Sequence, residues 1–367
     1  MLIDEMSDFG HLMKCARRCA RGVRWKASVQ RFEINKLMWV SKLSNQIADK
    51  TYKSMGFKRF DVNERGKIRH IQSVHISERV VQKALCNYAL KPYLLPELIY
   101  DNSASQEGKG TEFSLKRLKK HLTRHYQRYG LEGGILIMDY HDYFGQIPHD
   151  IVINQIESLL PDDSVNYFVE LFIDCFAGDK GLGLGSEISQ LAAILYPTPV
   201  DKYIAARSND NARYMDDSYS ISDNIEVLRQ LKDDIDTECK KLGIQLNQKT
   251  RIYLFKSDCF EYLKKRIRLE PGGKVSMRLT RKNVRSQRKY INSMKDDVIS
   301  GCRPGTSPKE SYTCWRGYAK KYNAYKTIGT MDKYYSKTMK EVSNVNQRGK
   351  RDQRDHGKDQ CTGKTAE

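Results

Sequence analysis

The chain has 367 residues, 39% of them hydrophobic, and 64 Lys and Arg against 45 Asp and Glu give a formal net charge of +19. This length allows a sizeable core and more than one subdomain. No apolar run reaches the length of a membrane span, and the N-terminus lacks the apolar core of a signal peptide, so a cytoplasmic protein without membrane contact is expected. The nine Cys include no CxxC pair, which argues against a disulfide framework and a zinc site.

The positive charge comes in clusters interleaved with 22 Tyr. Such a distribution predicts binding to a polyanion, most simply nucleic acid, and a solvated basic surface is the alternative. The basic clusters are Arg17 and Arg18, Lys116 and Arg117, Lys119 and Lys120, Lys240 and Lys241, Lys264 to Arg266, and Arg278 to Lys289.

The first part of the chain is predicted to be mainly helical. Residues 1–60 have apolar positions at helical spacing and indicate a basic amphipathic helix that packs on the next part of the chain. A short strand-like piece at 67–69 leads into a helix with Ser77 as its N-cap. A Gly/Ser loop then begins at Asp101 and runs into another helix.

The middle of the chain alternates strands with helices. The stretch from Gly133 predicts a buried strand that ends in a carboxylate, followed by a turn and a helix. A Gly-rich loop from Gly178 precedes a further helix, and RYMDDSYSIS, from Arg213 to Ser222, predicts a hairpin.

The last part of the chain begins with a helix and a strand from Asn224, followed by a second hairpin that turns at Pro271 and the two glycines after it. Residues 279–338 are predicted to be helical, basic and rich in Tyr. The chain from 339 on has almost no large apolar residues and predicts a disordered tail.

Two adjacent acids interrupt the strand-like RYMDDSYSIS. Because neighbouring side chains of a strand point to opposite faces, Met215, Asp216 and Asp217 are expected at the tip of the hairpin. The strand ILIMD ends in Asp139, and if it pairs beside the hairpin the three carboxylates converge. Hard oxygen ligands suit Mg²⁺, and two such ions clamp both oxygens of an in-line displacement at phosphorus. A polar turn is the plain alternative.

Five motifs in order then resemble the bacterial reverse transcriptase family. RYMDDSYSI resembles its signature hairpin, MDYHDYFGQIPHD its first catalytic stretch and GLGLGSEISQ the Gly-rich stretch between them, while LNQKT and FEYLKKRI resemble two later palm motifs. The resemblance runs from about Lys67 to Leu269, with weaker thumb-like similarity to Met339. It implies an α+β right-hand polymerase fold of fingers, palm with an antiparallel sheet, and helical thumb.

The resemblance also divides the chain and assigns its parts. The divisions are a basic helical extension at 1–60, fingers at 61–135, a palm at 136–275 with a helical insertion at about 150–180, a thumb at 276–338 and a disordered basic tail at 339–367. Gln106 stands where many relatives carry an Arg near the fingers glycine, and Gly145 stands where many carry an Asp. These departures put a triphosphate contact in doubt and loosen a turn.

Roles carry over to single residues as implications of this resemblance. Asp139 and Asp216 would hold Mg²⁺, or alternatively Mn²⁺, with Asp217 as a supporting carboxylate, and Lys249 would protonate the leaving pyrophosphate. Phe144 would exclude a 2′-hydroxyl; a core aromatic is its other interpretation. The remaining nucleotide-binding candidates are Lys67, Arg69, Lys109, Gly185 and Gln190, and the primer or template candidates are Tyr214, Met215, Leu263 and Lys264.

The implied activity is that of a nucleotidyltransferase, an RNA-directed DNA polymerase with an RNA template, a DNA or RNA primer and dNTPs as partners. The compact layout, without a recognisable nuclease, looks like the diversity-generating and unclassified defence-associated groups, which implies a retroelement, prophage or antiviral defence role with a dedicated non-coding RNA and an accessory protein as further partners. Two alternatives stay open: template-independent or protein-primed synthesis on the same fold, and a non-catalytic, maturase-like RNA-binding protein.

Overall fold

The structure is a computed structural model that describes residues 1–64, 67–208, 210–302 and 307–341. The chain divides into two compact units, one of Met1–Leu263 with Leu269–Val275 and one of Lys264–Arg268 with the chain from Ser276 on. Helices and antiparallel sheets make up both units, in agreement with the α+β class. No helix of the described residues is long and apolar enough to cross a membrane.

The N-terminal region is helical, as expected from the sequence, and consists of four short helices. They are α1 (Leu2–Ser7), α2 (Phe9–Ala20), α3 (Ala27–Ile34) and α4 (Lys36–Ala48). The break after α1 falls at Asp8, whose carboxylate accepts a hydrogen bond from the His11 backbone N–H at 2.7 Å and so caps α2. Their apolar residues, such as Leu12 and Ile47, are fully buried in the main core of the first unit.

A long β-hairpin and a bent helical segment come next. The hairpin pairs β1 (Phe57–Glu64) with β2 (Lys67–Val74), and the segment comprises α5 (Ile76–Ala84), a π-helix (Leu85–Leu90), α6 (Lys91–Leu94) and a 3₁₀ turn (Leu95–Glu97). The prediction of Ser77 as the N-cap of α5 is wrong. The cap is His75, two residues before the predicted one, and its Nδ1 lies 3.3 Å from the Ser77 backbone N–H.

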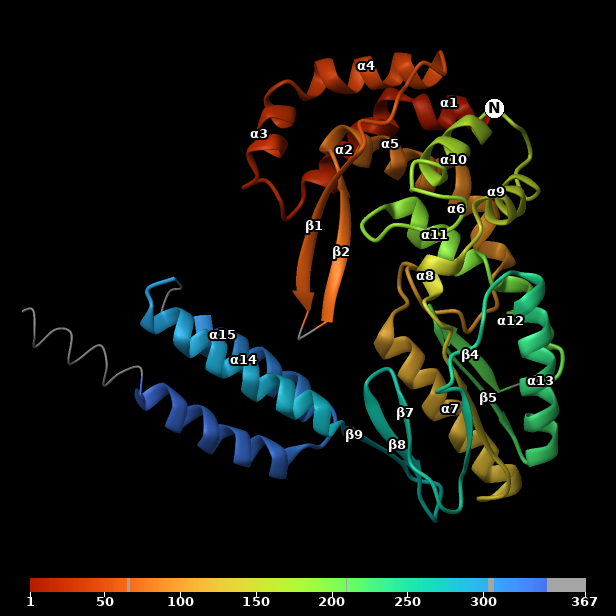
Figure 1. The fold of residues 1–367 in the computed structure, drawn as a ribbon, viewed down its shortest axis with the longest axis vertical. Coiled ribbons are helices and arrows are strands. Elements are labelled where there is room, and N and C mark those ends of the chain that lie inside the picture. Colours follow the sequence, from red (N-terminus) through yellow and green to blue (C-terminus); the bar gives the residue numbers. More distant parts are fainter. Residues whose placement is uncertain (65–66, 209, 303–306, 342–367) are drawn as a thin grey trace, which may run out of the picture. The chain divides into compact units, whose positions relative to one another are not determined.

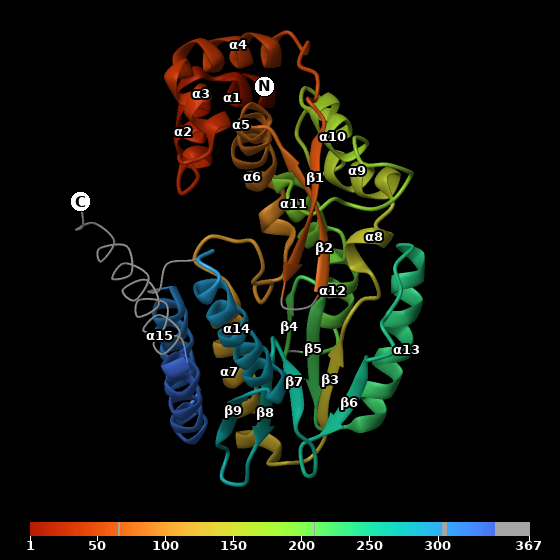
Figure 2. The same ribbon diagram turned by 60° about the vertical axis from the view of Figure 1, so that its left-hand side comes forward.

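The central sheet of the first unit has the strand order β4-β5-β3-β6 with antiparallel pairs throughout. Its strands are β3 (Gly134–Met138), β4 (Asn211–Tyr214), β5 (Asp217–Ser222) and β6 (Arg251–Leu254). The strands lie between α7 (Thr111–Tyr129) and α13 (Ile225–Lys241) in both views (Figure 1, Figure 2). Because both faces are covered, every residue of β3 is buried, which explains its continuous apolar run.

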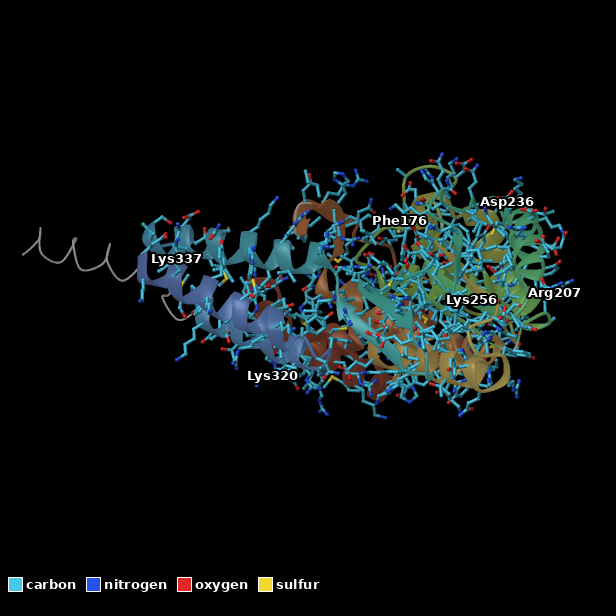
Figure 3. All side chains as sticks on the ribbon, turned by 90° about the horizontal axis from the view of Figure 1, so that it is seen from below. Phe176, Arg207, Asp236, Lys256, Lys320 and Lys337 are labelled. Carbon is cyan, nitrogen blue, oxygen red and sulfur yellow. The ribbon has the colours of Figure 1, made fainter. Side chains whose placement is uncertain are left out.

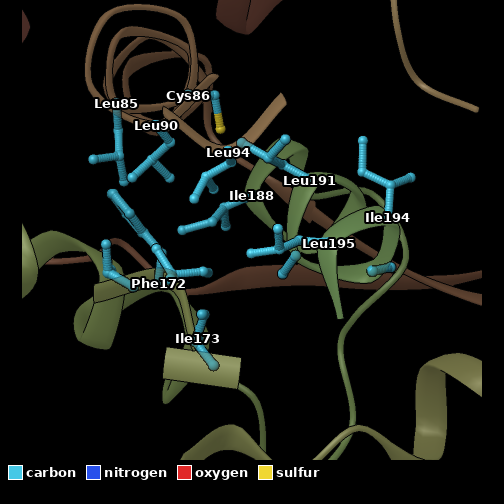
Figure 4. Packing of buried hydrophobic residues seen from close by; sticks show 14 of the residues in the cluster. Leu85, Cys86, Leu90, Leu94, Phe172, Ile173, Ile188, Leu191, Ile194 and Leu195 are labelled. Atoms are coloured by element: carbon cyan, nitrogen blue, oxygen red, sulfur yellow. The ribbon is translucent and has the colours of Figure 1, made fainter. Parts of the chain in front are cut away.

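The main core joins helices from distant parts of the sequence. The helices after β3 are α8 (Tyr143–Gln146), α9 (His149–Glu157), α10 (Asn166–Ile173), α11 (Glu187–Leu195) and α12 (Thr198–Ala205). Leu85 and Leu94 from the bent segment meet Phe172 of α10 and Leu191 of α11 (Figure 4). This packing ties the helix after the Gly-rich loop to the rest of the unit.

The second unit is built on β8 (Lys265–Leu269) and β9 (Val275–Leu279), which follow β7 (Phe260–Tyr262) in the chain. Its helices are α14 (Arg281–Ile299), α15 (Ser307–Lys320) and a helix over 325–341. Trp315 and Met331 contribute to a small core of their own, and Lys320 and Lys337 project from the helices (Figure 3). The expected tail from 339 begins inside the last helix, and its residues 342–367 lie outside the described residues.

Candidate active site

The acidic hairpin has a two-residue turn. Tyr214 of β4 pairs with Asp217 of β5, so Met215 and Asp216 alone form the tip and Asp217 already belongs to the strand. Met215 has φ +55°, a left-handed conformation that is uncommon for a residue other than glycine and is typical of functional turns. All three side chains after Tyr214 are half-buried, so the carboxylates of Asp216 and Asp217 retain access to solvent.

Asp139 reaches the same end of the sheet from the neighbouring strand. The register of β3 against β5 ends with Met138 opposite Ser218, and continuing it by one residue sets Asp139 opposite Asp217. The sequence expectation that this strand pairs beside the acidic hairpin is therefore met. Among the described residues, no group of three or more His, Cys, Asp or Glu is gathered closely enough to form a complete metal site.

The chain after α13 holds the backbone of Asp139 in place. The Asn247 backbone N–H donates to the Asp139 carbonyl at 2.7 Å, and the Asp139 N–H donates to Thr250 Oγ1 at 3.2 Å. Lys249 lies between these two residues with its side chain exposed. The turn thus brings a lysine next to the strand end that carries Asp139, although neither Asn247 nor Thr250 was singled out from the sequence.

A buried arginine forms a hydrogen bond with the backbone of the acidic turn. Arg213 is fully buried, its Nη1 donates to the Met215 carbonyl at 3.1 Å, and its Nη2 donates to the Ile194 carbonyl at 2.6 Å. The Arg213 Nε lies 2.9 Å and 2.8 Å from the two carboxylate oxygens of Asp201 on α12. Burial raises the pKa of Asp201, and the positive charge of Arg213 opposes that shift.

Neither Arg213 nor Asp201 was recognised from the sequence as part of the site. The available signal was a charged residue in a strand that is otherwise apolar or small, directly before Tyr214. A charge at such a position is rarely buried without a partner. The partner itself lies in a helix 12 residues away and could not be identified from the pattern.

The two aromatic residues after Asp139 have different environments. Tyr143 is buried and its hydroxyl donates to the Ala193 carbonyl, so it is a core residue. Burial raises the pKa of Tyr143, and the negative charge of Asp216 adds to the shift. Phe144 is only half-buried and packs edge-on against Tyr143 with ring centroids 5.7 Å apart. The exposed part of its ring is available to a ligand.

The Gly-rich loop packs closely on the β1–β2 hairpin. The Gln72 N–H donates to the Leu184 carbonyl at 3.0 Å, and a Cβ added at Gly185 would lie 2.9 Å from the Gln72 carbonyl oxygen. A Cβ at Gly183 would overlap the ring of Phe176. Gly185 was predicted to contact the nucleotide, and the close approaches seen at the two glycines in the structure are to β2 and Phe176. Gln190 is exposed on α11.

The basic residues predicted to contact a triphosphate are placed differently from one another. Arg69 lies on β2 opposite Val62, and Lys67 opens that strand with a side chain outside the described residues. The Lys109 amine donates to the carbonyls of Tyr100 at 2.8 Å and Asn102 at 3.2 Å. Desolvation lowers the pKa of Lys109. Lys109 thus has a structural role in its own loop.

The candidates for primer contact follow β7. Leu263 has φ +46° and Lys264 has φ +61°, two consecutive left-handed conformations of the kind required by a tight hairpin turn. Tyr262, just before them, is buried, and its hydroxyl lies 2.8 Å from Ser114 Oγ of α7. Burial raises the pKa of Tyr262, with a further contribution from the charge of Asp217.

The comparison with protein families agrees with this arrangement. The model of the family described as Reverse transcriptase (RNA-dependent DNA polymerase) matches residues 53–267. This stretch contains the β1–β2 hairpin, the Gly-rich loop, the central sheet and β7. A search of curated proteins finds no match to the chain.

Proposed function

The chain belongs to the reverse transcriptase family, and from this premise we propose that it synthesises DNA on an RNA template by two-metal nucleotidyl transfer. Membership implies a nucleotidyltransferase with a palm-like fold that acts on an RNA template, a primer and nucleotides. The single observation that supports this chemistry is that β3 and the β4–β5 hairpin bring Asp139 and the Asp216 turn to one end of one sheet.

The carboxylates suit divalent metal ions of the kind that such domains generally use. Asp139, Asp216 and Asp217 offer hard oxygen donors, they are half-buried, and they follow or open strands that are otherwise buried. Mg²⁺ is held by one or two protein carboxylates, with water and substrate phosphates as its other ligands. We assign Asp139 and Asp216 as the ligands and Asp217 as their support. Bound there, the ions would activate a primer 3′-hydroxyl and neutralise charge on the triphosphate.

Other residues of the site would orient the nucleotide. Phe144 follows Asp139 by five residues and keeps part of its ring exposed against Tyr143, which supports a role in excluding the ribose 2′-hydroxyl. Lys249 is exposed next to the residues that hold Asp139, which supports proton donation to the pyrophosphate. Gly185, Gln190, Lys67 and Arg69 remain proposed nucleotide contacts, and Tyr214, Met215, Leu263 and Lys264 proposed primer or template contacts.

The test is extension of a DNA primer on an RNA template with Mg²⁺ and dNTPs. Asp216→Asn should abolish extension while the protein stays folded. Asp223→Asn is the matched control, because Asp223 is exposed just beyond the far end of β5, and it should retain full extension. Extension by the Asp216 variant would refute the assignment. Product formed without any template would instead favour untemplated or protein-primed synthesis.

The biological role belongs to the same proposal. We place the protein in a bacterial retroelement, a prophage or an antiviral defence system, on the basis of the family to which its motifs belong. Sequencing of nucleic acid that copurifies with the wild-type protein and with the Asp216→Asn variant tests this. One dedicated RNA in both samples, with cDNA only in the wild type, is the expected result. RNA without cDNA in either sample would favour the maturase-like alternative.

A further inference from the structure

The turn between α2 and α3 carries an exposed indole among positive charges. Trp25 is 74% exposed. The stretch from Lys14 to Lys26 contains no acidic residue. Its basic residues are Lys14, Arg17, Arg18, Arg21, Arg24 and Lys26. A hollow of about 510 Å³ is lined by Arg17, Arg21, Gly22, Arg24 and Trp25.

Most of these basic and aromatic side chains remain available to a ligand. Arg24 pairs with Glu33 at 3.2 Å, whereas Arg17 and Arg21 have no ion pair within the described parts of the chain. The Lys26 amine lies 5.4 Å from the Trp25 ring, an attractive contact that leaves most of the indole open to solvent. An aromatic platform beside guanidinium groups is the combination that binds single-stranded nucleic acid, because bases stack on the ring and phosphates pair with the cations.

The basic surface around Trp25 borders α5, which carries a further exposed arginine. The α2 helix packs beside α5 (Figure 1, Figure 2), and Cys19 Sγ donates to the Arg79 carbonyl at 3.4 Å. The exposed Arg79 lines a second cavity of about 180 Å³. Its other lining residues are Gln82, Gly185, Ser186, Glu187 and Gln190.

The second cavity is lined by a buried side-chain amide. Gln82 is 1% exposed, and its Oε1 accepts from Ser186 Oγ at 3.0 Å and from the Glu187 backbone N–H at 3.3 Å. The same side chain interacts with the buried Glu78 carboxylate, which lies one helical turn earlier on α5. The Glu187 carboxylate is balanced by Lys83 at 2.6 Å and Lys91 at 3.1 Å, so it does not make the cavity anionic.

We propose that the single-stranded 5′ part of the RNA template, which has not yet been copied, passes along the Gln82 cavity and Arg79 and stacks a base on Trp25. This inference rests on the proposed function. It assigns RNA binding to a segment outside residues 53–267, the part that matches the family. The spacing of cavity, Arg79 and hollow along α5 and α2 favours an extended strand over a duplex, because only unpaired bases expose a face for stacking.

The test compares two double variants with equal changes in charge and aromatic content. Arg21→Gln/Trp25→Ala alters the proposed surface, and Arg128→Gln/Tyr129→Ala alters an exposed Arg–aromatic pair at the end of α7. In both views that end of α7 lies at the opposite end of the first unit (Figure 1, Figure 2). Each protein is titrated with primer–template duplexes that carry either a short or a long 5′ RNA overhang, at several salt concentrations.

The surface variant should bind the long-overhang template about 5- to 100-fold more weakly than the wild type, the range for loss of one stacked base. For the surface variant, the slope of the logarithm of the binding constant against the logarithm of the salt concentration should become shallower by about 0.7, because one phosphate contact is lost. The short-overhang template should bind unchanged, and the control variant should behave as the wild type. Equal binding of the long overhang by both variants would overturn the inference. Asp216→Asn should keep the overhang effect while losing extension, so a failure of the proposed chemistry and a failure of this surface are told apart.

Discussion

Arg213 Nη1 donates a hydrogen bond to the carbonyl of Met215, the left-handed residue of the acidic turn, at 3.1 Å. The same guanidinium is fully buried and paired with Asp201. A planar group with several fixed donors can hold a turn and an ion pair together. Arg213 is therefore a positioning residue for Asp216, which follows Met215 directly.

Arg213→Lys should show whether Arg213 positions the Asp216 turn, in addition to stabilising the fold. Lysine keeps the charge beside Asp201 but, as a point donor, cannot also reach the carbonyls of Ile194 and Met215. We expect kcat for dNTP incorporation to fall about 10- to 100-fold with little change in KM, because small misplacement of a reacting group has effects of this size. The control is Arg117→Lys, the same change at an arginine of α7 that forms an ion pair with Asp101. An unchanged kcat in a folded Arg213 variant would remove this role.

Phe144→Ala should relax sugar selection. Shortening the half-buried ring makes room for a 2′-hydroxyl, and the preference for dNTPs over rNTPs should fall at least about tenfold, as expected when a steric pocket is enlarged. The measurement is kcat/KM for a matched pair of nucleotides. Tyr143→Phe, which removes only the hydroxyl bonded to the Ala193 carbonyl, should lower stability but leave the preference intact. The proposal fails if both variants keep the wild-type preference.

Gly183→Ala should destabilise the Gly-rich loop. The added methyl group would overlap the Phe176 ring, and overpacking of this kind costs about 1–3 kcal/mol in the free energy of unfolding. Urea unfolding of the first unit gives the value. Adding Phe176→Leu in the same chain should restore part of the loss, because it vacates the space. Full stability of the single variant would show that the ring moves aside without cost.

Lys265→Met should change how the stability of the second unit depends on pH. Lys265 is 2% exposed, its amine donates to the Tyr318 hydroxyl, and it lies 4.2 Å and 4.3 Å from the rings of Tyr318 and Tyr322. Burial, with a smaller effect of Lys264, lowers the pKa of Lys265 from 10.5 to about 8. The folded state therefore releases this proton at lower pH than the unfolded chain.

The sign of the effect follows from proton linkage. Between about pH 8 and 10.5 the unfolded chain binds more protons at this group, so its contribution to stability rises with pH by at most about 1.4 kcal/mol per unit. The Met variant should be more stable than the wild type near pH 7, and its advantage should shrink by pH 9. Unfolding in urea at both pH values measures this. The matched control is Arg266→Met, which changes an exposed residue on the same strand. A pH-independent difference would contradict the assignment.

Several features of the fold were predictable from local patterns. The apolar run ending in Asp139, the acidic hairpin and the helix after the Gly-rich loop all appear where expected, because strand length, alternation and turn residues are local properties. The predicted cap at Ser77 was wrong. The exact end of a helix depends on contacts of single side chains, such as that of His75 with the Ser77 N–H.

The sequence by itself determined that three carboxylates flank strand ends in the order typical of the family, and that the chain is basic. Only the tertiary structure decided which residues support them. The pairing of Arg213 with Asp201, the Asn247–Thr250 turn on Asp139 and the packing of α2 on α5 each join segments that lie apart in the sequence. Periodicity within one segment predicts which face is buried, but the partner across the interface is set by packing of the whole unit.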